Sequence, residues 1–303
     1  QEMKRYKDIV GDAGSQIVVQ LEEQKARLAA RFNGIRHTVL VMSGKGGVGK
    51  TAITVNLAAI LAMEGYTVGI LDADINGPSI AKMLGVRGER LRIGEKGVVP
   101  AVGPLGIKVM SMDLLLPGDA PVIWEAPTQQ DAFVWKGLME VNALREFLAD
   151  TNWGELDFLF LDLPPGPDRL PNVAQLLPRL SGALIVTIPS EVSHLVVKRS
   201  IAAAKELKAP IMGLMENMAG YVCIRCGAVG ALFPGGGAEA MAADLGIPYL
   251  GRIPFDPRIA SSSDEGRPFV LEQGNSPTGK ALAEVGQAVK RFVGAGLPMK
   301  EVP

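Results

Sequence analysis

The glycine-rich stretch GKGGVGKT, residues 44–51, constrains the fold of this chain more than any other feature. It fits the pattern G-x-x-x-x-G-K-[ST], and it lies between the apolar run TVLVMS, residues 38–43, and a helical run at 51–64. A strand, a glycine loop and a helix in this order form a P-loop, in which backbone N–H groups and the helix amino terminus hold phosphate oxygens. The motif therefore predicts a nucleotide-binding α/β domain. A glycine-rich turn with an exposed lysine is the alternative.

Short apolar runs alternate with helical runs along the rest of the chain. Most of the apolar runs are continuous, which is typical of strands buried on both faces of a parallel sheet. The pattern predicts one doubly wound α/β fold, with a mostly parallel sheet of about seven or eight strands and right-handed crossovers. The expected strands are 38–43, 67–72, 107–112, 157–162, 182–188, 210–217 and 249–254, and the expected helices are 51–64, 137–150, 193–208, 236–245 and 277–293.

The segment before the first strand also has helical periodicity. In SQIVVQLEEQKARLAARF, residues 15–32, apolar side chains fall near one face of a helix. We expect an N-terminal helical extension at 1–37, a P-loop ATPase domain at 38–293 with a cysteine-containing loop at 220–230, and a C-terminal tail at 294–303.

Three aspartates follow strongly apolar runs. Asp162 ends DFLFLD, and Asp72 and Asp74 end the strand in ILDADINGPS. Open α/β folds bind ligands at the carboxyl ends of their strands, and a charge after so apolar a run needs a partner. We expect the Thr51 hydroxyl to ligate Mg²⁺, with the aspartates in the magnesium shell, and Lys50 to reach the β- and γ-phosphates. A role as cap or turn residue is the alternative for the aspartates.

Both cysteines of the chain, Cys223 and Cys226, lie in YVCIRCG, residues 221–227. A Cys-x-x-Cys pair supplies half of the four thiolates that a tetrahedral zinc ion or a [4Fe–4S] cluster takes. A redox pair is less favoured, because glycines follow and no helix amino terminus is expected to lower a thiol pKa. Shared zinc and a buried structural pair stay open.

Composition excludes several classes of partner. The net charge of −1 gives no basic field for nucleic acid or an anionic membrane. The longest apolar runs, such as LAAILAM at 57–63, are too short to span a bilayer, and the amino terminus lacks the apolar core of a signal peptide. Two thiols do not make a disulfide framework, so we expect a cytoplasmic protein.

A lysine directly after the first glycine of the loop, Lys45, distinguishes this P-loop. The sequence KGGVGKT resembles the deviant Walker A motif of the MinD, ParA and nitrogenase-iron-protein class. Within that class the chain resembles the Mrp/ApbC family of cytosolic iron–sulfur cluster carrier ATPases. The resemblance covers roughly residues 36–293 and is carried by SGKGGVGKT, LDADINGPSI, WGELDFLFLDLPPG, MENMAGYVCIRCG, FPGGGAEAMAADLGIPYLGRIPFDP and SSSDEGRPFV.

The resemblance implies cofactors and residue roles. ATP, Mg²⁺ and a [4Fe–4S] cluster would be the cofactors, with zinc as a possible replacement for the cluster. Asp74 would orient the attacking water, and Lys45 would reach across a dimer interface to the partner's nucleotide. The implied catalytic residues are Lys45, Lys50 and Asp74; the implied nucleotide-binding residues are Gly44, Lys45, Gly46, Gly47, Val48, Gly49, Lys50, Thr51, Ala52, Asn217 (at the adenine) and Pro254; the implied magnesium residues are Thr51, Asp72 and Asp162; and the cluster ligands are Cys223 and Cys226.

Symmetry offers a source for the missing cluster ligands. A twofold axis near Cys226 would bring the same pair from a second copy, because an isologous interface presents one patch twice. The neighbouring AGY and GAVG are small enough for two backbones to approach closely. We therefore expect a homodimer with one bridging cluster.

The chain departs from the family pattern at several positions. Ile224 replaces the proline that usually follows the first cysteine. The switch region, usually PPGTGD, here reads PPGPDR, with Pro167, Asp168 and Arg169 in the changed positions. Parts of a W-R-G-P element occur twice, which indicates a local insertion near 124–136. The altered switch leads us to expect slow ATP hydrolysis.

The most favoured function is an ATP-dependent carrier that binds a labile iron–sulfur cluster at a dimer-bridging Cys-x-x-Cys pair. It would transfer the cluster to apo-proteins and have cluster scaffold proteins as further partners. The alternative is a MinD- or ParA-type regulatory or positioning ATPase in which the cysteines hold zinc or serve the structure. A reductase of the nitrogenase-iron-protein type is disfavoured, because its ligand cysteines lie far apart in sequence.

Overall fold

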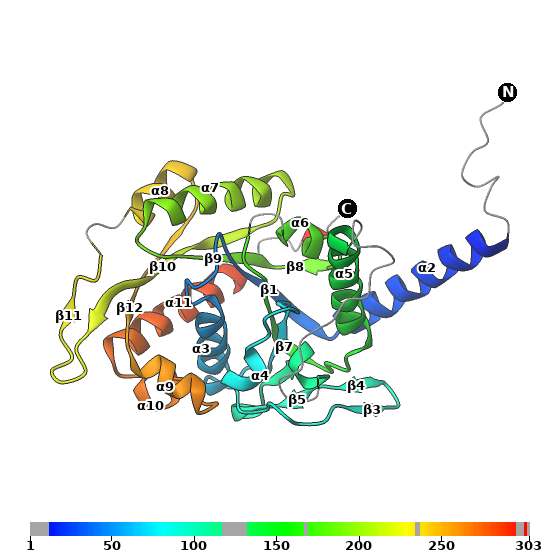
Figure 1. Cartoon of the computed structure of the whole chain (residues 1–303), viewed down its shortest axis with the longest axis horizontal. Helices are drawn as coiled ribbons and strands as arrows, with labels where there is room; N and C mark the ends of the chain where they lie inside the picture. The colour runs from blue at the N-terminus through cyan, green and yellow to red at the C-terminus, as the bar shows by residue number, and fades with distance from the viewer. Residues whose placement is uncertain (1–11, 117–131, 167–168, 234–236, 295–299, 302–303) are drawn as a thin grey trace.

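A single mixed sheet organises the molecule. The computed structural model describes residues 12–116, 132–166, 169–233, 237–294 and 300–301. Within these residues nine strands form one sheet in the order β11-β10-β9-β1-β7-β2-β6-β5, and β12 also pairs with β10 (Figure 1). The strands are β1 Ile35–Ser43, β2 Val68–Asp72, β5 Ala101–Val102, β6 Lys108–Met110, β7 Leu156–Asp162, β9 Gly182–Thr187, β10 Ile211–Val222, β11 Val229–Gly230 and β12 Tyr249–Phe255.

The sheet is parallel except at two short strands. β11 pairs with β10 and β5 pairs with β6 in antiparallel orientation, whereas the other pairings are parallel. Two small two-stranded sheets lie outside it, formed by β3 Arg92–Gly94 with β4 Gly97–Val99 and by β8 Arg179–Leu180 with β13 Lys300–Glu301. The predicted fold class is confirmed.

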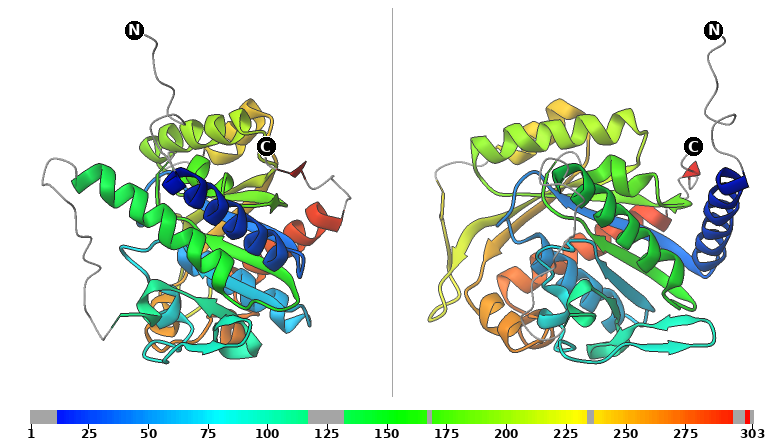
Figure 2. Two further views of the ribbon diagram at one scale, coloured as in Figure 1. Left: turned by 90° about the vertical axis from the view of Figure 1, so that its right-hand side faces the viewer. Right: turned by 45° about the vertical axis from the view of Figure 1, so that its right-hand side comes forward.

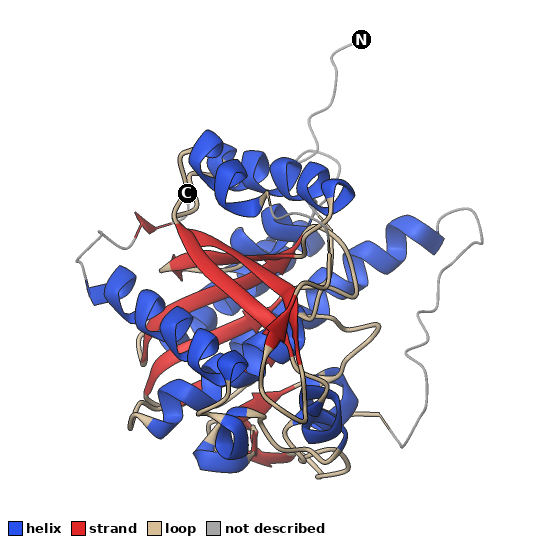
Figure 3. Cartoon of the chain, turned by 90° about the vertical axis from the view of Figure 1, so that its left-hand side faces the viewer, coloured by secondary structure: helices blue, strands red, loops and turns tan. Residues whose placement is uncertain are grey.

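Helices cover both faces of the sheet, as Figure 3 shows. The buried side chains of β1 alternate between the two layers: Leu40 and Met42 join one apolar core, and Val39 and Val41 join the other. The first core is closed by α2 Asp12–Phe32, α5 Ala132–Asp150, α6 Arg169–Ala174, α7 Glu191–Glu206 and α8 Ala238–Leu245. The second is closed by α3 Lys50–Met63, α4 Ile80–Met83, α10 Val270–Gln273 and α11 Pro277–Gly294, with α9 Arg258–Asp264 beside α4.

The last turns of α2 hold this helix on the domain. Leu28 and Phe32 are buried, and α2 lies alongside α5 (Figure 2). Arg31 donates from Nε to the carbonyl oxygen of Ala149 at 3.1 Å. The domain boundaries drawn from the sequence stay a prediction, and no helix of the described ranges is long and apolar enough to cross a membrane.

Each predicted strand and helix has a counterpart, while several short elements could not be expected from sequence. The strands β5 and β11 and the helices α4, α6, α9 and α10 have only two to seven residues, too few for a periodic signal. Segments this short depend on tertiary packing rather than on their own propensity. Most of the expected insertion near 124–136, and the switch residues Pro167 and Asp168, lie outside the described residues.

Candidate nucleotide site and cysteine hairpin

The glycine loop connects the centre of the sheet to α3. β1 lies between β9 and β7 and ends at Ser43, and α3 begins at Lys50. Gly47 and Gly49 have φ values of 77° and 80°, in the left-handed region that glycine enters without steric cost. The Ser43 hydroxyl donates to the carbonyl oxygen of Lys45 at 3.0 Å, and the N–H of Gly166 donates to that of Ser43 at 3.0 Å. The beginning of the loop is thus held in place by hydrogen bonds at Ser43.

Gly49 tolerates a side chain less well than Gly47. A Cβ on Gly49 would lie 2.3 Å from Asn217 Nδ2, whereas one on Gly47 would meet nothing within 4 Å. We expect Gly47→Ala to lower the free energy of unfolding by about 1–2 kcal/mol through backbone strain alone. Gly49→Ala should cost roughly 1 kcal/mol more, because Asn217 must also move and give up a hydrogen bond. Urea denaturation of the nucleotide-free variants measures the difference, and equal losses would contradict the predicted contact.

A buried ion pair lies where the glycine loop meets the start of α3. Lys50 Nζ is 2.5 Å from Asp162 Oδ2, and the two side chains are 8% and 1% exposed. The hydroxyl of Thr51 donates to Asp162 Oδ2 at 2.7 Å, and the hydroxyl of Thr54 donates to Asp162 Oδ1 at 2.6 Å. The predicted group Lys50, Thr51 and Asp162 is therefore brought together. Thr54 was missed, although its position one helical turn after Lys50 was a usable signal.

Asp72 lies beside this cluster on the neighbouring strand. The parallel register of β2 and β7 pairs Asp72 with Asp162. Asp72 Oδ2 accepts the N–H groups of Ser79 and Ile80 at 2.9 and 3.1 Å, and the hydroxyl of Ser111 at 3.2 Å. Burial, together with the nearby Asp162 carboxylate, raises the pKa of Asp72 to about 7 even though these N–H groups oppose the shift. A divalent cation would relieve this repulsion.

The raised pKa of Asp72 predicts a pH-dependent stability in the metal-free protein. The folded state keeps a proton up to about pH 7 that the unfolded state releases near its ordinary pKa of 3.8. The unfolded state therefore binds fewer protons in this window, and the free energy of unfolding should fall as pH rises through it, by up to about 1.4 kcal/mol per pH unit. Asp72→Asn lacks this titration, so its stability should fall less steeply in urea denaturation between about pH 5 and about pH 7. Equal slopes would contradict the assignment.

The other two residues with predicted catalytic roles line the same edge of the sheet. Asp74 is half-buried, and its Oδ1 accepts the N–H of Gly77 at 3.2 Å. Its own N–H donates to Asp72 Oδ1 at 3.2 Å. Lys45 is half-buried in the glycine loop and forms no ion pair with any described residue. Both side chains are available to a ligand, and their roles stay predictions.

Asn217 contacts the glycine loop in the present structure. Its Nδ2 donates to the carbonyl oxygen of Val48 at 2.8 Å, and its side chain is buried. Pro254 follows Ile253, the register partner of Asn217, and Thr278 donates to its carbonyl oxygen at 3.0 Å. The remaining residues of the predicted nucleotide set lie in or after the loop: Gly44 against α7, Gly46 near Pro165, and Ala52 in the first turn of α3. The adenine contact predicted for Asn217 stays a prediction.

The two cysteines lie at the tip of a β-hairpin formed by β10 and β11. This hairpin and α2 lie at opposite ends of the molecule (Figure 1). The N–H of Cys223 donates to the carbonyl oxygen of Ala228 at 2.9 Å, and the N–H of Gly227 donates to that of Cys223 at 2.8 Å. Gly227 has a φ of 73°, which lets the chain reverse. Both thiols are free, and Cys226 is exposed while Cys223 is partly buried.

The hairpin favours the thiolate form of Cys223 but holds few ligands. N–H groups of Cys226 and Arg225, together with the Cys226 thiol, lower the pKa of the Cys223 thiol. Within the described ranges no group of three or more His, Cys, Asp or Glu side chains could hold a metal ion. The described residues therefore supply only a partial ligand set at this tip.

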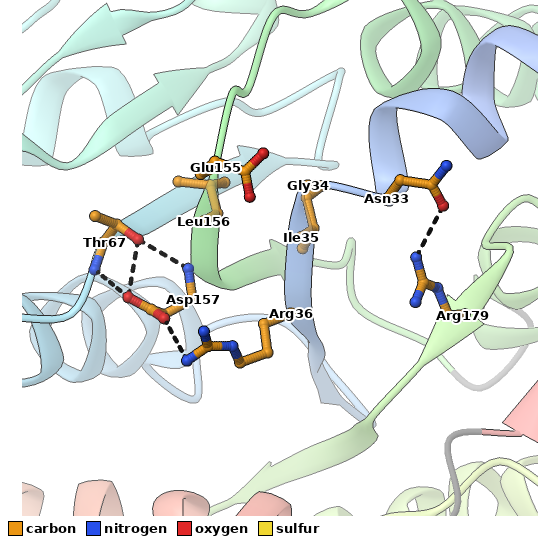
Figure 4. Close-up of a pocket in the computed structure, with 9 residues that line it drawn as sticks. All are labelled: Asn33, Gly34, Ile35, Arg36, Thr67, Glu155, Leu156, Asp157 and Arg179. Carbon is orange, nitrogen blue, oxygen red and sulfur yellow. Dashed lines mark hydrogen bonds and ion pairs between the residues drawn. The ribbon is translucent and has the colours of Figure 1, made fainter.

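A cavity of about 300 Å³ lies at the opposite, amino-terminal edge of the sheet (Figure 4). Three of its charged side chains, Arg36, Asp157 and Arg179, bond to residues of the fold itself. Arg36 pairs with Asp157 at 2.9 Å, and Arg179 donates to the carbonyl oxygen of Phe32 at 3.0 Å and to Asn33 Oδ1 at 3.2 Å. Ligands of open α/β sheets bind at the carboxyl edge instead, so this cavity is not the candidate site.

The strand–loop–helix geometry and the two aspartates at neighbouring strand ends define a P-loop NTPase. The family described as "ParA: NUBPL iron-transfer P-loop NTPase" matches residues 34–133 and 126–290. The chain belongs to this family, the NUBPL/Mrp-type iron–sulfur cluster carrier P-loop NTPases. The predicted family is confirmed.

Individual relatives agree with this assignment. A protein from Saccharolobus solfataricus named iron–sulfur cluster carrier protein is 44% identical to the chain, and the match covers 90% of this chain and 90% of that protein. A protein of the same name from Methanocaldococcus jannaschii is 46% identical, and the match covers 90% of this chain and 89% of that protein. A solved nucleotide-binding protein from Archaeoglobus fulgidus, in complex with ADP, is 36% identical with a TM-score of 0.68, over 80% of this chain and 92% of that one. The cell division ATPase MinD from Pyrococcus furiosus, 21% identical with a TM-score of 0.60 over 84% of this chain and 99% of that one, shares the fold.

Proposed function

We propose that this protein is an ATP-dependent carrier of an iron–sulfur cluster. The cluster is held by Cys223 and Cys226 of two chains and is transferred to apo-proteins. The observation that carries the proposal is the hairpin tip, where two free thiols stand without a third ligand among the described residues. A labile cargo needs such an accessible, incomplete site, whereas a permanent structural metal is normally closed by four ligands of one chain.

A second copy of the chain completes the ligand set. Two hairpins related by a twofold axis bring four thiolates together, the number that a [4Fe–4S] cluster takes. The lowered pKa of Cys223 favours the thiolate that binds iron. The names of the relatives from S. solfataricus and M. jannaschii support iron–sulfur cargo over zinc.

ATP binds at the glycine loop. Its phosphates compete with Asp162 for Lys50, whose ammonium is already positioned beside the loop. Thr51 and Asp162 suit Mg²⁺, because hydroxyl and carboxylate oxygens are the ligands it prefers, and Asp72 carries a second carboxylate close by. Bound there, Mg²⁺ would neutralise charge that develops on the transferred phosphate.

Hydrolysis requires a positioned water and charge compensation. Asp74 orients the water from its place beside Asp72, and Lys45 reaches the nucleotide of the partner chain in the dimer. The changed residues of the PPGPDR sequence, 167–169, directly follow Gly166, which is hydrogen-bonded to Ser43 at the start of the loop. We therefore expect slow turnover, with hydrolysis serving as a switch rather than as a continuous cycle.

Anaerobic reconstitution with iron and sulfide tests the proposal. We expect about two irons per chain, and transfer of the cluster to an apo-protein such as apo-aconitase in the presence of an iron chelator. Retention of zinc with no iron uptake under the same conditions would contradict it. That result would favour the alternative, a MinD- or ParA-type regulatory ATPase whose cysteine hairpin is structural.

A further inference from the structure

One strand carries contacts to both proposed sites. β10 holds Asn217 against the glycine loop and continues to Val222, directly before Cys223. Cys223 therefore lies six positions after Asn217, the residue that contacts the P-loop. A change of the loop on nucleotide binding can reach β10 through the hydrogen bond between Asn217 and Val48, and the cysteine hairpin through the backbone of β10.

Two side chains of β10 meet the loop at one residue. The place of a Cβ on Gly49 is 2.3 Å from Asn217 Nδ2 and 3.6 Å from Met218 Cε. Gly49 immediately precedes α3 and would contribute to phosphate binding. When the loop closes on phosphates, the Asn217 side chain must respond, because its Nδ2 is hydrogen-bonded to the carbonyl oxygen of Val48, and Met218 follows it directly in the chain.

The strand is irregular directly after this contact. Met218 has a φ of 55°, in the left-handed region that a non-glycine residue rarely adopts. Asn217 pairs with Ile253 and Tyr221 pairs with Phe255, so β10 uses four residue steps where β12 uses two. This bulge is a segment that a small input can rearrange, because its backbone is strained and its residues are not held in a continuous ladder.

Arg252 on β12 contacts β10 both before the bulge and within it. Its Nε lies 3.1 Å from Glu216 Oε2, before the bulge, and its terminal nitrogen donates to the carbonyl oxygen of Ala219 at 3.3 Å. Beyond the bulge, Val222 is fully buried and the ring of Tyr221 stacks on Phe255 at 6.5 Å. The base of the hairpin is thus packed against the Phe255 end of β12, so a rearrangement of the bulge would move the hairpin together with this end of β12.

We propose that β10 couples the P-loop to the cysteine hairpin, with Met218 and Arg252 as positioning residues on either side of the bulge. The inference rests on the proposed nucleotide and cluster sites. Nucleotide binding shifts the bulge between two arrangements and so changes the exposure of Cys223 and Cys226. Coupling of this kind alters the property of a distant site by about fivefold or more.

Thiol reactivity measures the coupling without iron. In reduced, metal-free protein, Mg²⁺–ATPγS should change the rate of iodoacetamide alkylation of the two cysteines by about fivefold or more. Met218→Gly relieves the strain and removes the contact with Gly49, so its response should drop below about twofold while its Kd for nucleotide stays within about twofold of wild type. Lys208→Gly is the matched control: Lys208 has a φ of 53° but precedes β10 at the other edge of the sheet. It should keep the full response.

Arg252→Gln provides a second variant and should also lose the response, because it breaks the ion pair with Glu216 and the hydrogen bond to the carbonyl oxygen of Ala219. A full response in both variants, or a wild-type protein that binds nucleotide without any change in alkylation, would overturn the coupling. The experiments test the carrier function independently of the coupling. A protein with coupled thiols that accepts no cluster refutes the carrier proposal and leaves the coupling standing, and a cluster carrier with nucleotide-independent thiols does the reverse.

Discussion

Lys50→Ala should slow ATP hydrolysis by at least about a hundredfold and also lower the free energy of unfolding of the ligand-free protein by about 3 kcal/mol or more. The two effects have different causes. Hydrolysis is lost because no ammonium stabilises the charge on the transferred phosphate. Stability is lost because the carboxyl group of Asp162, which is 1% exposed and 2.5 Å from Lys50 Nζ, is left buried without its partner. Single-turnover phosphate release and urea denaturation measure the two quantities.

A double variant and an exposed ion pair provide the controls for this prediction. Lys50→Ala combined with Asp162→Asn removes both charges, so it should recover much of the lost stability while hydrolysis stays absent. Lys290→Ala breaks the more exposed pair with Glu64, and it should cost about 1 kcal/mol or less. If Lys50→Ala proves no less stable than Lys290→Ala, the buried pair behind the loop is assigned incorrectly.

Cys223→Ser and Cys226→Ser should each abolish cluster binding. Serine offers a hydroxyl in place of a thiolate, and in the symmetric dimer each substitution removes two of the four ligands at once. We expect the absorbance near about 400 nm to disappear and iron per chain to fall at least about tenfold after anaerobic reconstitution. ATP binding by the cluster-free protein should be unchanged, since neither cysteine is part of the glycine loop.

Ile224→Ser is the matched control for the cysteine variants. It places the same side chain between the two cysteines, at a position that is 63% exposed and carries no sulfur. This variant should retain iron at the wild-type level. Equal losses in Ile224→Ser and Cys223→Ser would indicate that the hairpin tolerates no polar substitution, and the argument for thiolate ligation would fail.

Sequence predicts the fold well because the parallel strands are continuous apolar runs and the glycine loop fixes the position of one of them. It also predicts Lys50, Thr51 and Asp162 as neighbours, since strand ends and helix starts meet at one edge of the sheet. It also predicts Asp72 and Asp162 in one magnesium shell, but it does not predict that β2 and β7 are adjacent strands that pair these two residues in register. The pKa of Asp72 depends on that adjacency.

The end of β10 shows the other limit of sequence reasoning. The expected strand stopped at Asn217, yet β10 continues to Val222 through the bulge at Met218. A left-handed methionine has no sequence signal of its own, and the continuation depends on Arg252 and on the β12 backbone. Contacts between residues far apart in the chain therefore determine the conformation of the end of β10, which joins the two proposed sites.

Native mass spectrometry of the reconstituted protein tests the central claim most directly, because it counts chains and clusters in one particle. If each polypeptide supplies half of the cluster ligands, the dominant species has the mass of two chains and one [4Fe–4S] cluster, and it separates into cluster-free single chains when the cluster is removed. A single chain that retains a complete cluster, or a zinc ion bound by one chain alone, would contradict the account.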